Sequence, residues 1–68
     1  MENKEEFRDF LREEAETLQE KVESIEVRMS NILLKQGISS LDKLNKLNTE
    51  KEMVNAQAIK LYELIGRL

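Results

Sequence analysis

The six residues KQGISS, Lys35 to Ser40, decide the fold of this chain because they form the break between two long helical patterns. Gly37 is suited to the left-handed backbone conformation that ends many helices at the C′ position. Ile38 is then expected to pack back on Leu33, as in a Schellman motif. Ser39 is expected to act as the N-cap of the next helix. The stretch therefore predicts a helix end, a turn at residues 37–39 and a second helix start.

The segment before the break carries a 4-3 repeat of apolar residues, which is typical of a helix that packs along one side. The repeat consists of Leu11, Ala15, Leu18, Val22, Ile25, Met29 and Ile32. Asn3 is expected to cap the start of this helix, with Glu6 completing a capping box. The pattern predicts a first helix from about residue 4 to about residue 36.

The segment after the break carries a matching repeat and predicts a second helix from about residue 40 to about residue 66. Its members are Leu44, Leu47, Val54, Ala58, Leu61, Ile65 and Leu68. Lys51 interrupts this repeat and is expected to reach solvent at the edge of the core, near Glu26. In the alternative interpretation, Lys51 is a polar residue that selects register and partner at some cost in stability.

A connection this short makes two helices antiparallel neighbours. Pairing outward from the turn places Ile32 beside Leu44 and Leu11 beside Ile65, so the two repeats match in register. The sequence therefore predicts an all-α fold: one antiparallel two-helix hairpin that occupies residues 1–68 as a single domain.

The chain is small, with 68 residues and neither Cys nor His. A domain of this size buries only about 60% of its unfolded surface and is marginally stable on its own. Disulfides and thiolate metal sites are excluded because there is no Cys, which leaves oligomerisation or very good helix packing as the support.

Apolar residues outside the two repeats indicate a second packing surface. Phe7, Leu33 and Leu64 are expected only to widen the contact between the two helices. The remaining residues predict an interface with another helical surface, since a contiguous exposed apolar patch usually marks an interaction site. The predicted interface residues are Val27, Leu34, Met53, Ala56, Ile59 and Tyr62.

Charge is distributed unevenly along the chain. Residues 1–26 hold ten acids and four bases, whereas residues 27–46 hold four bases and one acid. Two hairpins packed turn to tail would bring each basic turn beside the acidic end of its partner. We therefore expect a two-fold homodimer that forms a four-helix bundle, with electrostatics setting its orientation.

Catalytic and metal-binding functions are not predicted. Carboxylates such as Glu13 and Glu16 share one helix face, but a metal site in a bundle also needs matching ligands on a second helix. The serines have no His or other evident base beside them. We expect no enzyme activity, no metal and no cofactor.

The predicted function is that of a small interaction module, an adaptor, regulator or assembly subunit that acts through helix–helix association. One alternative is a subunit of a heteromeric complex that docks through its second helix. Another is a ROP-like hairpin dimer that binds nucleic acid, an analogy of fold only. Its possible phosphate contacts are Arg28, Lys35, Lys43 and Lys46.

Nucleic acid is the less favoured partner because the net charge is −3. No apolar run approaches the length of a membrane span, so no membrane partner is expected. The polar N-terminal residues MENKEEF do not resemble a secretory signal, and the expected location is the cytoplasm.

Overall fold

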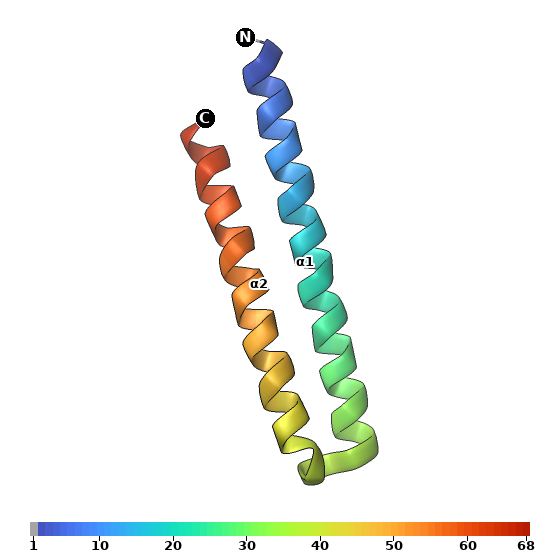
Figure 1. Cartoon of the computed structure of the whole chain (residues 1–68). Coiled ribbons are helices and arrows are strands. Elements are labelled where there is room, and N and C mark those ends of the chain that lie inside the picture. The colour runs from blue at the N-terminus through green and yellow to red at the C-terminus, as the bar shows by residue number, and fades with distance from the viewer. Residues whose placement is uncertain (1) are drawn as a thin grey trace.

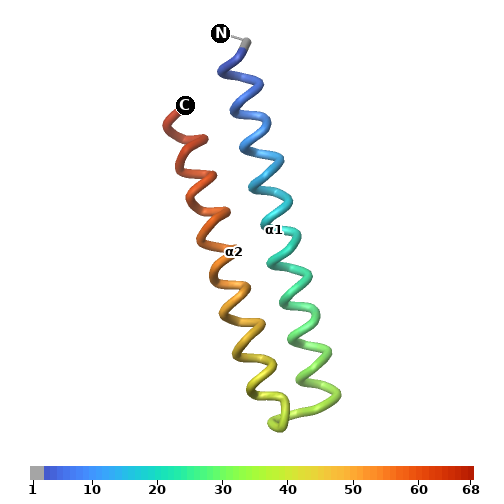
Figure 2. Tube along the Cα trace, viewed as in Figure 1, coloured from blue at the N-terminus to red at the C-terminus, as the bar shows by residue number. Residues whose placement is uncertain are grey.

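The structure is a computed structural model that describes residues 2–68, with side-chain surroundings from Asn3 onward. Two long helices, α1 (Glu2–Gln36) and α2 (Leu41–Arg67), are joined by one turn of 3-10 helix, η1 (Gly37–Ser40). The helices run antiparallel and side by side (Figures 1 and 2) in a rod of 54 × 14 × 11 Å. The predicted all-α hairpin is confirmed.

The first helix starts earlier than the sequence indicates. Because α1 already includes Glu2, Asn3 lies within the helix and the prediction that it is the N-cap is wrong. Carboxylates near a helix N-terminus interact favourably with the helix dipole. Glu5 lies close to this end, so the helix can extend without a cap at Asn3.

The turn is closed by Gly37, which has the predicted left-handed conformation with φ at +62°. The expected contact of Ile38 with Leu33 is wrong, because the chain enters the 3-10 turn and leaves Ile38 88% exposed. The hairpin therefore reverses through a tight turn that lacks the hydrophobic contact of a Schellman motif.

The two serines of the turn do not cap α2 with their side chains. The cap position is Ser40 and not Ser39, and its side chain makes no capping hydrogen bond. Instead, the hydroxyl of Ser39 donates to the carbonyl of Gln36 and that of Ser40 to the carbonyl of Gly37, both at 2.6 Å. Ser side chains often bond to a backbone carbonyl three residues earlier, and here they stabilise the turn itself.

The two glycines should respond in opposite ways to the same substitution. Gly37→Ala is expected to destabilise the hairpin by about 1 kcal/mol, because a side chain disfavours a positive φ. Gly66→Ala lies within α2, with open space around the added methyl group, and should stabilise it by about 0.5 kcal/mol. Thermal unfolding followed by circular dichroism measures both, and a common sign would contradict this account of the turn.

The core is the contact line between the two helices, which we call the seam. All residues of the two predicted repeats are buried or half-buried, and so is Lys51. The most buried apolar side chains, each at most 9% exposed, are Leu11, Ala15, Ile25, Leu47, Val54 and Ala58. Two of these six are alanines, so the hairpin alone buries little apolar volume.

Candidate interaction site

Large apolar side chains cover much of the outside of the hairpin. Eleven of those in the described part of the chain are between 38% and 88% exposed. They are Phe7, Phe10, Val27, Leu33, Leu34, Ile38, Leu41, Met53, Ile59, Tyr62 and Leu64. Large exposed apolar patches on small proteins usually belong to interaction surfaces.

The accessible surface area supports the same conclusion. The hairpin exposes 5532 Å², whereas a compact monomer of its mass, 8.0 kDa, would expose about 4,500 Å². The excess of roughly 1,000 Å² is comparable to the area that one partner contributes to a standard protein–protein interface. The rod shape therefore exposes more surface than a compact fold of the same mass would.

Heptad positions define how each residue lies around its helix. With the seam residues at positions a and d, positions g and c of both helices share one flank of an antiparallel pair, and positions e and b share the other. Position f points directly away from the seam, along the outer edge of each helix. The heptad position of each predicted interface residue therefore gives its direction relative to the seam.

The six predicted interface residues do not form one patch. Val27 and Leu34 occupy successive f positions on the outer edge of α1. Met53, Ala56 and Ile59 follow one another at spacings of three across the back of α2, at positions c, f and b, from the g/c flank to the e/b flank. The outer edges of the two helices point in opposite directions, so the structure gives two separate apolar groups.

Tyr62 differs from the other predicted interface residues because it bonds within the hairpin. Its hydroxyl donates to Oε1 of Gln19 at 3.0 Å, which joins the e positions of α2 and α1. Its side chain is still 38% exposed. The ring of Tyr62 therefore remains exposed, while its hydroxyl is fixed by the hydrogen bond to Gln19.

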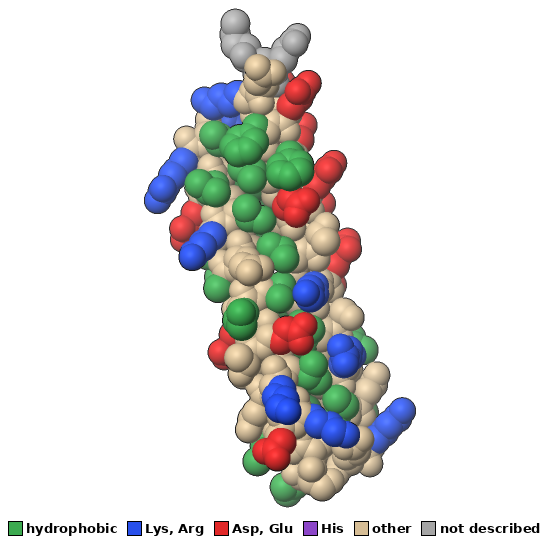
Figure 3. Space-filling model, viewed as in Figure 1, with side chains coloured by type: hydrophobic (Ala, Val, Ile, Leu, Met, Phe, Trp, Pro, Cys, Tyr) green, Lys and Arg blue, Asp and Glu red, His purple; other side chains and the backbone are tan. Residues whose placement is uncertain are grey.

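Exposed basic side chains gather on the flank of g and c positions, which we call the basic flank. Its bases are Lys21, Arg28, Lys35, Lys43, Lys46, Lys60 and Arg67, and its acids are Glu14 and Glu50. Its apolar side chains are Phe7, Phe10, Met53 and Leu64. Figure 3 shows several Lys and Arg side chains near the turn and others along the edge of α2, with hydrophobic side chains densest toward the termini. The four predicted phosphate contacts all lie on this flank.

The opposite flank, of e and b positions, is acidic, and we call it the acidic flank. Its acids are Glu5, Asp9, Glu16, Glu23, Glu26 and Glu52, and its base is Arg12. Arg12 pairs with Asp9 at 3.9 Å. Its apolar side chains are Leu33, Leu41, Ile59 and Tyr62. The two flanks thus carry net charges of +5 and −5.

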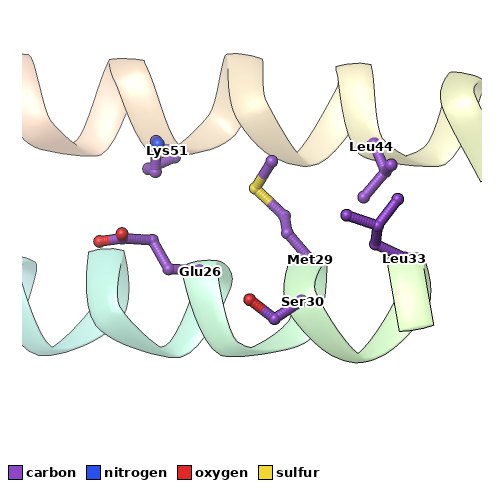
Figure 4. A pocket seen from close by; sticks show the side chains of 6 residues that line it. All are labelled: Glu26, Met29, Ser30, Leu33, Leu44 and Lys51. Atoms are coloured by element: carbon purple, nitrogen blue, oxygen red, sulfur yellow. The ribbon is translucent and has the colours of Figure 1, made fainter.

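A groove of about 300 Å³ opens on the acidic flank near the turn. It is lined by Glu26, Met29, Ser30, Leu33, Leu44 and Lys51 (Figure 4). Glu26 and Lys51 stand on facing helices, as expected from the sequence, but form no ion pair within 4 Å. The exposed lining is mostly apolar, which suits the groove to a hydrophobic side chain better than to a polar ligand.

Sequence reasoning missed three features of these surfaces. Leu41 is half-exposed beside the turn and lies outside both apolar repeats. Arg8 continues the seam toward the N-terminus and has a buried Nε without a hydrogen-bond partner. The segregation of charge between the flanks was also missed, although the heptad positions of the charged residues carry that signal.

Other classes of site find little support in the described residues. Residues 2–68 contain no group of three or more His, Cys, Asp and Glu placed to hold a metal ion. Neither described helix is long and apolar enough to cross a membrane. Protein-family models, curated proteins and solved structures give no match to this chain.

Proposed function

We propose that this chain is a non-enzymatic protein-interaction module that works through helix–helix association, with copies of itself as its first partner. The observation that carries the proposal is that eleven large apolar side chains are exposed around a seam in which six apolar side chains are buried. Covering part of that surface would supply the burial that the hairpin lacks, because each 100 Å² of apolar area contributes about 2.5 kcal/mol.

The groups available for chemistry also favour a binding role. The groove near the turn is open and offers Glu26, Ser30 and Lys51 as its polar side chains. A nucleophilic Ser needs a base within hydrogen-bond reach, and Ser30 makes no such bond in the structure. Association of helices requires none of these groups to react.

The absolute mass in solution tests the proposal directly. Light scattering after size exclusion, at two protein concentrations, should give masses above the 8.0 kDa of the monomer. The melting temperature should rise with protein concentration, because association stabilises the folded state by mass action. A folded monomer with one melting temperature at both concentrations would contradict self-association and leave a different protein as the partner.

Ile59 offers a point substitution for the same experiment. Ile59→Glu should lower the average mass in solution, because it removes a half-exposed apolar side chain outside the seam. Thr49→Glu is the matched control, since it adds the same charge at an exposed position of α2 without removing an apolar side chain. An equal loss of mass in both variants would show that charge, and not apolar contact, is responsible.

A further inference from the structure

We propose that the partner of the basic flank is the acidic flank of a second copy of this chain, stacked in the antiparallel direction. The inference rests on the proposed function and specifies its partner and geometry. It differs from the two-fold dimer that the sequence suggests, because it joins two different surfaces. The argument depends on charge, on the placement of apolar side chains and on the groove.

Charge selects which surfaces meet. A two-fold dimer places one patch against the same patch of its partner. Basic flank on basic flank would oppose net charges of +5, and acidic flank on acidic flank would oppose net charges of −5. Like charges facing each other across an interface are strongly unfavourable, whereas complementary potentials steer association. Contact between unlike flanks is therefore favoured.

The distribution of side chains along each flank selects the direction. On the basic flank, Arg28, Lys35, Lys43 and Lys46 lie in the half near the turn, and Phe7, Phe10 and Leu64 lie near the termini. On the acidic flank, Glu5, Asp9 and Glu16 lie near the N-terminus, and Leu33 and Leu41 lie near the turn. Because α1 of one copy lies along α2 of the next, antiparallel stacking places Lys43, Lys46 and Lys60 opposite Glu5, Asp9 and Glu23, and Phe7 and Phe10 opposite Leu41. Parallel stacking instead places Phe7 and Phe10 beside Glu5 and Asp9, and Lys43 beside Leu41.

The groove fits this arrangement. In an antiparallel stack with flush ends, the first turns of α1 in one copy lie over the turn-proximal end of α2 in the other. Phe7 and Phe10, which are 52% and 56% exposed, then face the apolar groove beside Leu33 and Leu44. Burial of an aromatic side chain in a preformed groove is a common anchor of protein interfaces.

The same geometry has a consequence for the size of the assembly. When the basic flank of one copy contacts the acidic flank of another, the first copy keeps a free acidic flank and the second keeps a free basic flank. Further copies can therefore add at both ends. The proposal predicts assemblies larger than a dimer, whose average mass grows with concentration and falls as salt screens the charges.

Charge reversal with complementation tests the proposal. In the antiparallel stack, α1 of one copy runs along α2 of the next, and the pairs Asp9/Glu23 and Lys46/Lys60 have the same spacing of two heptads. We would prepare Lys46→Glu/Lys60→Glu, Asp9→Lys/Glu23→Lys and, as a matched control, Glu6→Lys/Glu20→Lys on the outer edge of α1. Circular dichroism establishes that each variant is helical, and light scattering at low salt gives its mass.

The expected result is a monomer for each flank variant alone, restored assembly when the two are mixed, and assembly of the control by itself. If a reversal unfolds the hairpin, Lys46→Gln/Lys60→Gln and Asp9→Asn/Glu23→Gln replace the charges without inverting them and should weaken assembly. A wild-type dimer that neither grows with concentration nor responds to the flank variants would overturn the stack while leaving self-association intact.

A short RNA or DNA duplex is the competing ligand for the basic flank. Retention of the duplex by the wild-type chain, lost in Lys46→Glu/Lys60→Glu but not in the control, would overturn the proposal if the chain is otherwise monomeric. Such binding should weaken steeply with salt through counterion release. Assembly without retention of the duplex supports the stack.

Discussion

Ile25→Ala is expected to unfold the hairpin or to lower its melting temperature by roughly 10 to 30 °C. Ile25 is 3% exposed at the middle of the seam, and replacing a buried Ile by Ala costs about 2 to 5 kcal/mol. A chain of this length has a total stability of only about 3 to 10 kcal/mol. For small domains each kcal/mol corresponds to about 4 to 8 °C. Thermal unfolding followed by circular dichroism at a fixed protein concentration measures the effect.

Ile38→Ala is the matched control for this experiment. It deletes the same atoms from a side chain that is 88% exposed in the turn, where substitutions change stability by less than about 0.5 kcal/mol. Its melting temperature should therefore stay close to that of the parent. Equal losses in the two variants would show that the seam is not the part of the molecule that holds the helices together.

Lys51→Leu is expected to raise the stability of the hairpin by about 1.5 kcal/mol, or roughly 6 to 12 °C in melting temperature. Lys51 is half-buried at a seam position and lines the groove with Glu26, with no ion pair to compensate for its burial. A Leu at this position would complete the apolar repeat of α2. Thermal unfolding in about 0.5 M salt, where contacts between charged surfaces are screened, measures the gain.

Lys60→Leu makes the same chemical change at an exposed position of α2 and should give little gain. The mass of Lys51→Leu then decides between the two interpretations of this residue. An altered association state would show that the polar seam residue selects the partner. An unaltered state would show a lysine that merely reaches solvent at the edge of the core.

The seam could be predicted from the sequence because it depends on one physical rule applied many times. Each residue from Leu11 to Ile32 in the 4-3 repeat lies on the same side of its helix, and the turn at Gly37 sets how the two repeats pair. One polar residue at a position of the repeat does not prevent the repeat from being recognised. The hairpin and the pairing of its two repeats could therefore be predicted from the sequence.

The hydrogen bonds at the helix ends could not be predicted from the sequence in the same way. Ser39 can cap a helix or bond to a preceding carbonyl, and these alternatives differ by about 1 kcal/mol or less. The structure has the second, with Ser39 bonded to Gln36. Sequence patterns do not resolve competing local hydrogen bonds of this size.

The candidate site could be predicted only in part, because the sum of charges along the chain does not show how those charges lie around the helix. That sum placed Arg28, Lys35, Lys43 and Lys46 near the turn, which is correct. It could not show that Lys60, far from the turn, lies on the same flank. Once the seam fixes the heptad position of each residue, the flank follows from the sequence.

The tight turn at Gly37–Ser40 also has a kinetic consequence. The residues that face each other across the seam are close in sequence beside the turn and become steadily more distant toward the termini. Closing a short loop costs less chain entropy than closing a long one. The contacts between the two helices should therefore form first beside the turn and then progressively toward the termini. The turn should then govern the rate of folding, and the terminal half should govern the rate of unfolding.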